Sequence, residues 1–336
     1  MNNPIVTVLL PVYNAERYIA LAVESILKQS FRDFELLIIN DGSTDNSLEI
    51  IRSFKDERIR LVTNESNQKL IATLNKGIQL ARGKYIARMD ADDISLPERL
   101  QKQVDFMESH PEVGVCGAWF EPLELPGKAV KYPERDENIR IMMLYQTPFC
   151  HPVVMLRKEV LAQQNIFFSP DFIHGEDYEM WVRLSSVTQF ANIPEVLLRY
   201  RSHESSVSAS YPSIQKTKTY AVVRMVFEKT GLNVSDSEIE LFRDIVHAKF
   251  KVDKDFIQQG ETLLLKLLEA NKRTHYQPVA ELQQFVSEKW FHLCYNTTSL
   301  GAWMYALYFN SALSKYQKMN LGIRLKFIIK TMLRIK

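Results

Sequence analysis

Three carboxylates follow a hydrophobic run in the sequence Met89-Asp90-Ala91-Asp92-Asp93. Carboxylates this close repel one another unless a cation or a helix N-terminus compensates their charge. A divalent cation such as Mg²⁺ or Mn²⁺ is typically held by one or two carboxylates, and phosphates of a substrate complete its coordination. The motif therefore predicts a divalent metal and a substrate that carries a diphosphate. Capping of the next helix is the alternative, and because a cap needs one acid we assign it to Asp93 alone.

A second acidic loop runs from Asp41 to Asp45, after another aliphatic run. Gly42 is expected to turn the chain, and in the simpler interpretation Thr44 or Asp45 only caps the helix that follows. Asp41, however, leaves the predicted sheet at the same edge as the three carboxylates described above. A carboxylate there can accept a hydrogen bond from the ring N–H of a pyrimidine base, so we expect Asp41 to bind a nucleotide.

A third group of acids lies in the segment from His174 to Trp181. We expect Gly175 to turn the chain and the following residues to begin a helix. Attack by a hydroxyl group needs a general base, and a carboxylate at a helix start can supply one. Asp177, with Glu176 beside it, is the candidate. A surface helix start enriched in acids for the helix dipole is the alternative.

The elements that position these loops are short aliphatic runs alternating with helical patterns between residues 5 and 120. Continuous apolar runs are typical of strands buried on both faces of a parallel sheet. The predicted strands are Ile5–Leu10, Glu35–Asn40, Ile59–Thr63, Tyr85–Met89 and Val113–Phe120, with a strand-like segment at Val196–Tyr200. Open α/β sheets bind ligands outside the carboxyl ends of such strands, where the acidic loops fall.

Two helix signals accompany these strands. The first is a set of apolar residues at helical spacing, Ile19, Ala22, Val23 and Ile26. Asn14 is placed to cap that helix. The second is Ser95–Glu98, which has the pattern of a capping box with a proline in the first turn and predicts a helix that ends near His110.

Strand patterns disappear after about residue 213, so we expect an α/β domain over residues 1–210 and a helical region over residues 211–336. A second capping box, Ser235–Glu238, precedes a helix predicted over Ile239–Phe250.

The last predicted helix is amphipathic and basic. Eight of the 42 Lys and Arg residues, and none of the 40 acids, follow Glu288. One helical face carries Leu321, Leu325, Ile328, Met332 and Ile335, and another carries Lys326, Lys330 and Arg334. Large aliphatic residues beside basic ones favour an anionic membrane surface over nucleic acid. Packing of the apolar face on the protein body is the alternative.

Composition limits the remaining classes. With 336 residues, 46% of them hydrophobic, the chain can bury a sizeable core. Cys116, Cys150 and Cys294 form neither a disulfide framework nor a zinc pattern, which favours a reducing cytosol. We expect the N-terminal apolar run to be a buried strand rather than a signal peptide, and no stretch reaches the roughly 18 apolar residues of a transmembrane helix. A cytoplasmic protein with peripheral contact at the inner face of the plasma membrane is expected.

Four motifs occur together in the order Pro11-Val12-Tyr13-Asn14, Asp41-Gly42-Ser43-Thr44-Asp45, Asp90-Ala91-Asp92-Asp93 and Gly175-Glu176-Asp177. In that order and spacing, over about residues 5–207, the sequence resembles bacterial family-two glycosyltransferases. The resemblance implies a GT-A fold with a mostly parallel sheet and sugar transfer by single displacement with inversion. It also implies Mn²⁺ or Mg²⁺, a nucleotide-sugar donor, and a glycan or lipid-linked acceptor in cell-surface polysaccharide synthesis. UDP is the default nucleotide, with dTDP and GDP open.

The resemblance also assigns residue roles in donor binding. Pro11, Tyr13 and Glu16 would border the base, which Asp41 would bond. Asp90 would contact the ribose, and Ala91 belongs to the same donor-binding set. Asp92 would hold the metal on the diphosphate. By analogy His203 would be a second metal ligand, although an ordinary exposed or core histidine is equally plausible.

On the acceptor side, the resemblance makes Asp177 the general base, with Glu176 in the same catalytic pair. Trp181 would form an apolar face for a sugar ring, although a core role is equally plausible. His151 could line the acceptor site, but an ordinary structural role is favoured there.

One segment departs from the family pattern. The family commonly shows Asn-x-Gly after the third strand, whereas this chain has Asn67-Gln68-Lys69-Leu70. Lys69 therefore places a side chain where backbone usually approaches the ligand. It could contact phosphate or mark an altered donor pocket.

Other functional classes fit less well. The Gly-rich loop of sugar nucleotidyltransferases is absent after the first strand, and there is neither a Walker loop nor GxGxxG. A non-catalytic nucleotide-sugar-binding or scaffold protein of the same fold is the best rival. It would keep Asp41 and Asp90 but would not need Asp177, and the intact Gly175–Asp177 motif argues against it.

Overall fold

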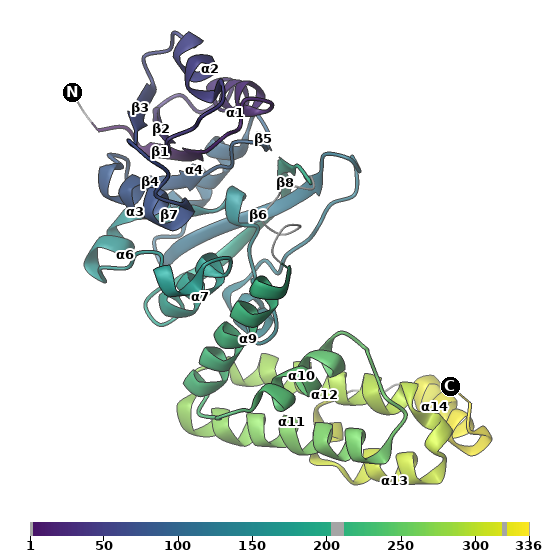
Figure 1. Ribbon diagram of the computed structural model, residues 1–336. Helices are drawn as coiled ribbons and strands as arrows, with labels where there is room; N and C mark the ends of the chain where they lie inside the picture. The colour runs from purple at the N-terminus through teal and green to yellow at the C-terminus, as the bar shows by residue number, and fades with distance from the viewer. Residues whose placement is uncertain (1–2, 203–211, 318–320, 336) are drawn as a thin grey trace. The chain divides into compact units, whose positions relative to one another are not determined.

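The computed structural model describes residues 3–202, 212–317 and 321–335. They form two compact units, coloured purple to teal and green to yellow in Figure 1. The first unit comprises Met1–Ile139 and Thr147–Thr219, and the second comprises Arg140–Gln146 and Tyr220–Lys336. The boundary at residues 219 and 220 falls inside helix α9 (Pro212–Lys229), close to the division predicted from the sequence.

The first unit is built on a mixed sheet with the order β3-β2-β1-β4-β7-β6-β8-β5. Its strands are β1 (Val6–Val12), β2 (Phe34–Asn40), β3 (Ile59–Thr63), β4 (Tyr85–Arg88), β5 (Ile94–Ser95), β6 (Val113–Pro122), β7 (Met155–Arg157) and β8 (Gln189–Tyr200). The pairs β1–β2, β2–β3, β1–β4 and β6–β8 are parallel, whereas β7 and β5 pair antiparallel with their neighbours. The five strands predicted up to residue 120 are confirmed to within two residues.

Helices cover both faces of this sheet. They are α1 (Ile19–Leu27), α2 (Ser47–Ser53), α3 (Leu70–Leu80), α4 (Arg99–Ser109), α5 (Asp136–Met142), α6 (Lys158–Gln163) and α7 (Glu176–Leu184), with 3-10 turns η1 (His151–Val153) and η2 (Pro170–Phe172). Helices α1 and α4 pack on one face, and α3 covers the other. There Gly77 lies so close to Leu9 that a Cβ at Gly77 would be 2.2 Å from a Leu9 methyl carbon.

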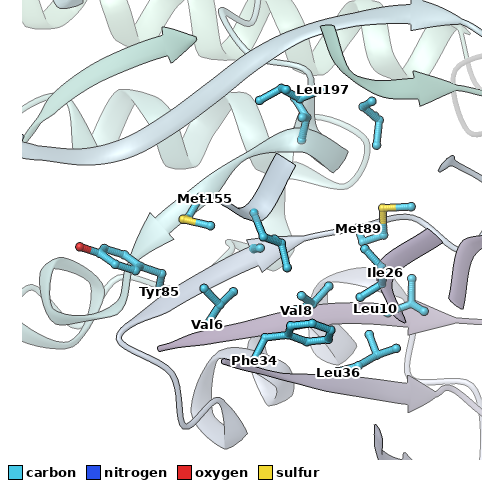
Figure 2. Packing of buried hydrophobic residues seen from close by; sticks show 14 of the residues in the cluster. Val6, Val8, Leu10, Ile26, Phe34, Leu36, Tyr85, Met89, Met155 and Leu197 are labelled. Carbon is cyan, nitrogen blue, oxygen red and sulfur yellow. The ribbon is translucent and has the colours of Figure 1, made fainter. Parts of the chain in front are cut away.

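Strands β1 and β2 are buried at every position, as their continuous apolar runs predict. Figure 2 shows Val6, Val8 and Leu10 of β1 packing with Phe34 and Leu36 of β2. All four apolar residues predicted for the α1 face, Ile19, Ala22, Val23 and Ile26, are buried. This packing holds the carboxyl ends of β1, β2 and β4 at one edge of the sheet.

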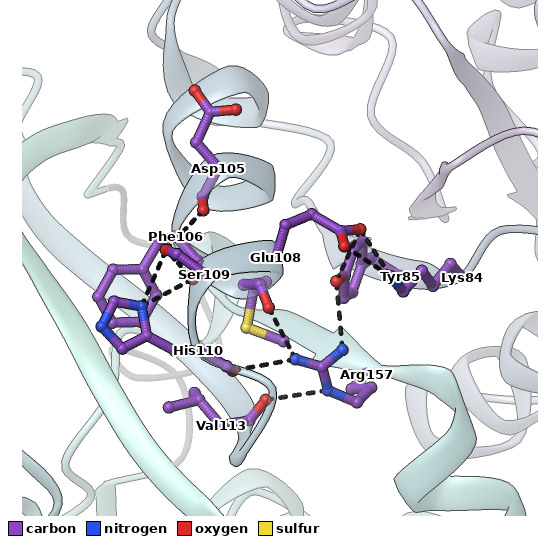
Figure 3. A network of polar contacts seen from close by, with 10 residues as sticks. Lys84, Tyr85, Asp105, Phe106, Glu108, Ser109, His110, Val113 and Arg157 are labelled. Atoms are coloured by element: carbon purple, nitrogen blue, oxygen red, sulfur yellow. Dashed lines mark hydrogen bonds and ion pairs between the residues drawn. The ribbon is translucent and has the colours of Figure 1, made fainter.

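A buried arginine ties the remaining strands together (Figure 3). Arg157 of β7 donates to the main-chain oxygens of Val113 at 3.1 Å, Met107 at 2.8 Å and His110 at 3.1 Å. Its Nη1 donates to the Tyr85 hydroxyl at 3.2 Å. One guanidinium thereby fixes the end of α4 against β4, β6 and β7.

The second unit consists of helices. They are the later part of α9, α10 (Asp236–Val246), α11 (Lys254–Thr274), α12 (Val279–Asn296), α13 (Ala302–Asn310) and α14 (Leu321–Leu333), with 3-10 turns η3 (Thr298–Leu300) and η4 (Ala312–Tyr316). Trp290 is fully buried at its centre, and the rings of Phe227 and Phe242 meet edge to face at 5.1 Å. None of the helices in the described ranges is long and apolar enough to cross a bilayer.

Predictions of helix ends had mixed success. The Ser235 capping box of α10 is confirmed, although the helix stops before Phe250 because Ala248 adopts a left-handed backbone with φ 57°. Asn14 does not cap α1: its side-chain oxygen instead accepts from the Thr44 N–H at 2.8 Å. The predicted box at Ser95 is also wrong, because pairing with β8 draws Ser95 into β5.

Candidate active site

A cavity of about 890 Å³ lies at the edge of the sheet where β1 and β4 end. Eight of the residues predicted for the site line it: Pro11, Tyr13, Glu16, Asp90, Ala91, Asp92, Glu176 and Asp177. The structure therefore brings together acids that are far apart in the chain. His203 lies outside the described residues, and its role as a metal ligand stays a prediction.

The metal-binding candidates are Asp90, Asp92 and Asp93, each of which offers a carboxylate oxygen within 4.8 Å of the others. Asp93 does not cap α4, contrary to the prediction. Its Oδ1 accepts from the Arg201 N–H at 2.8 Å, and its Oδ2 has no hydrogen-bond partner in the described part of the chain. Arg201 also donates to the Asp92 main-chain oxygen at 2.9 Å. The loop is thus fixed by Arg201, next to strand β8.

The charges of these acids are poorly compensated. Burial, and then repulsion from Asp90 and Asp92, raises the pKa of Asp93 well above its ordinary value. Burial also raises the pKa of Asp90, with repulsion from Asp92 adding to it and attraction to Arg88 opposing it. A divalent cation would relieve this repulsion, and oxygen ligands are those that Mg²⁺ and Mn²⁺ prefer. The residues present therefore fit such a metal.

The wall predicted to hold the nucleoside is made by two loops joined by hydrogen bonds. Glu16 accepts from the Asn46 N–H at 2.9 Å, and the Glu16 N–H donates to Asp45 at 2.9 Å. Asp45 also accepts from the Ser47 N–H at 3.0 Å, so it holds the start of α2 as the simpler interpretation expected. The cavity-lining loop after β1 is therefore fixed by the loop after β2.

Asp41 lies behind this wall, only 3% exposed and outside the cavity lining. Its Oδ1 accepts from the Asn64 amide at 2.7 Å and the Gln68 N–H at 2.8 Å, while its Oδ2 accepts from the Lys69 N–H at 2.9 Å. Each carboxylate oxygen has two lone pairs, so Oδ2 retains one for a further donor. Contact between Asp41 and a base stays a prediction.

Lys69 has an unusual backbone. Its φ of 73° and ψ of 162° fall in a region that is essentially confined to glycine. The Lys69 N–H donates to both Asp41 and Asn67, which fixes this conformation. The lysine therefore occupies a glycine-type conformation at the position where the sequence departs from the family pattern. Its side chain is exposed and lies outside the cavity lining.

Glu176 and Asp177 line the cavity from the first turn of α7. The left-handed residue before this helix is His174, with φ 66°, rather than Gly175. Burial, and then the neighbouring Glu176 charge, raises the pKa of Asp177 to about 7. Thr147 contacts Asp177 at 3.5 Å. A carboxylate with this pKa can take a proton from a bound hydroxyl near neutral pH.

Residues 7–163 match the protein family described as Glycosyl transferase family 2. The amylovoran biosynthesis glycosyltransferase AmsE of Erwinia amylovora is 30% identical over 84% of this chain and 98% of its own. An Escherichia coli relative, UDP-Glc:alpha-D-GlcNAc-diphosphoundecaprenol beta-1,3-glucosyltransferase WfgD, is 29% identical over 62% of this chain and 82% of its own. This chain belongs to glycosyltransferase family 2.

Solved structures agree with this assignment at the level of the fold. Residues 1–349 of S. aureus TarS, in complex with UDP-GlcNAc, match with a TM-score of 0.58, covering 86% of this chain and 88% of that chain at 19% identity. The mannosyltransferase PcManGT of Pyrobaculum calidifontis, in complex with GDP-Man and Mn²⁺, matches with a TM-score of 0.52, covering 98% and 88% at 16% identity. The glycosyltransferase has the GT-A fold, followed by a helical region.

Several cavity residues of this glycosyltransferase carry no sequence signal. Tyr132, Thr147 and Tyr200 line the cavity from segments without a recognisable motif. His151, by contrast, was named from the sequence as a possible acceptor-site residue, and it does line the cavity. Burial, and then the charge of Arg88, lowers the pKa of its imidazole well below the ordinary value. Trp181 lies outside the lining.

Trp181 instead has a core role. It is fully buried, and its ring meets those of Phe149 and His151 edge to face at 5.3 and 6.1 Å. It therefore supports the cavity wall from behind, and the predicted contact with a sugar ring is not available to it.

The Lys69 backbone predicts a substitution that stabilises the protein. Replacing Lys69 by glycine removes backbone strain of about 1 to 3 kcal/mol and costs about 0.5 to 1 kcal/mol of chain entropy. We expect Lys69→Gly to raise the free energy of unfolding, measured by urea denaturation. Lys69→Ala is the matched control, because it removes the side chain and keeps the strain. Equal effects of the two substitutions would contradict this interpretation.

The raised pKa of Asp177 predicts how stability depends on pH. Unfolding lowers this pKa from about 7 to 3.8, so the carboxyl group favours the folded state below pH 3.8 and loses that contribution as pH rises through 7. Because Asp177 is half-buried, we expect Asp177→Asn to raise the free energy of unfolding at pH 8 by about 1 to 3 kcal/mol. The gain should vanish near pH 4. A gain that is independent of pH would show another cause.

Proposed function

We propose that the protein transfers a sugar from a nucleotide-diphospho-sugar to a hydroxyl group of a glycan or lipid-linked acceptor, with a divalent metal and with inversion. The observation that carries this proposal is the placement of two acidic groups on one cavity. The Asp90–Asp93 cluster fits a cation and the diphosphate bound to it, and Asp177 is a carboxylate with a pKa of about 7. These are the two functions that a single displacement requires.

The protein side of the mechanism follows from this arrangement. Pro11, Tyr13 and Glu16 border the nucleoside, and Asp41 accepts from its base. Asp177 takes the proton of the acceptor hydroxyl as its oxygen attacks the anomeric carbon. Attack from the side opposite the leaving nucleotide diphosphate inverts that carbon.

The metal, when bound, offsets the charge that develops on the leaving diphosphate. Asp92 is the principal ligand that we propose for it, with His203 as a second. Asp90 and Ala91 line the cavity beside Asp92, where the ribose and diphosphate would bind.

The likeness to named proteins supports the donor and acceptor classes. TarS is seen with UDP-GlcNAc, and PcManGT with GDP-Man and Mn²⁺. The name of WfgD gives a UDP-linked glucose donor and a diphosphoundecaprenol-linked acceptor. For this chain we propose a UDP-sugar donor first and a lipid-linked acceptor in cell-surface polysaccharide synthesis.

Donor turnover tests this function. We expect one of a panel of UDP-, dTDP- and GDP-sugars, incubated with lipid-linked acceptors, to release nucleotide diphosphate with Mn²⁺ or Mg²⁺ and not with EDTA. Asp92→Ala and Asp177→Asn should each lower the rate by about 100-fold or more. Asp177→Asn should leave donor binding intact, because it removes only the proposed general base. Binding of a donor without turnover would favour a scaffold, and absence of both would refute the proposal.

We further propose that α14 contacts an anionic membrane from the cytoplasmic side, where a lipid-linked acceptor would be found. The helix packs through Phe327 and Thr331, which are buried. A separate apolar stripe remains in solvent: Leu321 is 74% exposed, Leu325 50% and Met332 77%. The helix therefore packs through another face than the apolar one named in the predicted packing alternative, and most of that apolar face is left exposed.

The charges around this stripe suit an anionic lipid surface. At helical spacing, Arg324 lies on one flank of the stripe and Lys326 on the other. The Arg324 guanidinium lies over the Phe309 ring at 5.2 Å. Apolar residues flanked by cations are typical of helices that lie in a membrane interface.

Vesicle sedimentation tests this contact. We expect the protein to bind phosphatidylcholine vesicles that contain phosphatidylglycerol and to bind pure phosphatidylcholine weakly. Serine at Leu321, Leu325 and Met332 together should lower the affinity by about tenfold or more, because less apolar surface is buried. Serine at Val252 and Val279, both 40% exposed on the same unit, is the matched control. Unchanged binding by the triple variant would refute the contact.

A further inference from the structure

Arg88 is a buried cation in the wall of the candidate active site. It is the last residue of β4, and its neighbours Tyr85 and Ala87 belong to the core cluster on the opposite face of the sheet. Its side chain lines the cavity although the residue is only 4% exposed. Arg17 also lines the cavity but lies in solvent. Arg88 is therefore the buried one of these two arginines.

The guanidinium of Arg88 is only partly satisfied. Its Nη1 forms an ion pair with Asp90. Despite that ion pair, neither Nη1 nor Nε makes a hydrogen bond of good geometry in the described part of the chain, although both atoms are shielded from solvent. A buried donor without a partner is unfavourable, so such groups usually meet a ligand or water. In this cavity a ligand oxygen can provide the acceptor.

The surroundings of Arg88 define the chemistry of that ligand. Its charge opposes the raised pKa of Asp90 on one side of the cavity and those of Glu176 and Asp177 on the other. The positive charge of the guanidinium therefore stabilises the ionised carboxylates both of the Asp90–Asp93 cluster and of the Glu176–Asp177 pair. A sugar diphosphate that spans them would bring further negative charge to this place. Arginine binds phosphate through paired N–H groups, in a geometry that lysine cannot reproduce.

We propose that Arg88 binds the sugar-bearing phosphate of the donor. This inference rests on the proposed function. Arg88 keeps its ion pair with Asp90 and donates a guanidinium N–H to a phosphate oxygen in the cavity that it lines. Arg88 thereby places the diphosphate between the Asp90–Asp93 cluster and the proposed general base, Asp177. Nucleoside monophosphates lack the phosphate that Arg88 recognises.

Calorimetric binding of UMP and UDP, each with Mg²⁺, tests this role. Arg88→Met keeps most of the side-chain volume and removes the charge. We expect it to weaken UDP binding by about 10-fold to 100-fold, the range of a charge-assisted hydrogen bond, and to change UMP binding less than about twofold. Arg88→Lys should recover only part of the UDP affinity. Arg52→Met, on the exposed surface of α2, is the control.

The alternatives give different results. If Arg88 only compensates Asp90, Arg88→Met will bind Mg²⁺ more tightly and will not weaken UDP binding relative to UMP binding, which would refute the proposal. If the methionine variant is too unstable to measure, Arg88→Lys is measured in its place. A UDP affinity of Arg88→Lys equal to that of the wild-type protein would also refute the proposal. Failure of the wild-type protein to bind any nucleotide diphosphate would instead refute the proposed function.

Discussion

Repulsion between carboxylates is the physical constraint on which the site depends. Strands β1 and β4 and helix α7 bring Asp90, Asp92, Glu176 and Asp177 to one cavity, and burial raises the pKa of three of them. The fold tolerates this cost because the sheet beneath is rigid and fully buried at β1 and β2. Burial and then repulsion from Glu176 raise the pKa of Asp177 to about 7, and a cation would relieve the repulsion within the Asp90–Asp93 cluster. The buried carboxylates of the cavity therefore lower the free energy of unfolding, while the proposed function requires their negative charge.

Much of the fold could be predicted because its signals are local. Continuous apolar runs indicated β1 to β4 and β6, and helical spacing identified the buried face of α1. Strand β7, only three residues long, has no such pattern, and it exists because Arg157 and its neighbours fit between β4 and β6. Asn14 and Ser95 have the residue types of helix caps. Tertiary contacts use them otherwise, since Asn14 binds the loop after β2 and Ser95 joins β5.

The site could be predicted where its chemistry is carried by acids in motifs. Asp90 and Asp92 are recognisable as acids clustered after an apolar strand, and Asp177 as an acid beside Glu176 at a helix start. Arg88 was missed because an arginine at a strand end resembles any surface residue until its burial is known. Asp41 also has a role that its motif does not reveal: its carboxylate accepts three hydrogen bonds that organise the segment from Asn64 to Lys69.

The hydrogen bonds between the loops after β1 and β2 have a consequence for the selection of donors. They join main-chain N–H groups to side-chain oxygens of Glu16, Asp45 and Ser47, so this wall is organised before any ligand arrives. A nucleoside that meets such a surface loses little of its binding energy to loop ordering. Affinity for the nucleoside is then largely uniform among donors that share it. Discrimination between their sugars would then fall to other lining residues of the cavity, such as Tyr132, His151 and Tyr200, and new sugar specificity can arise there without disturbing nucleotide recognition.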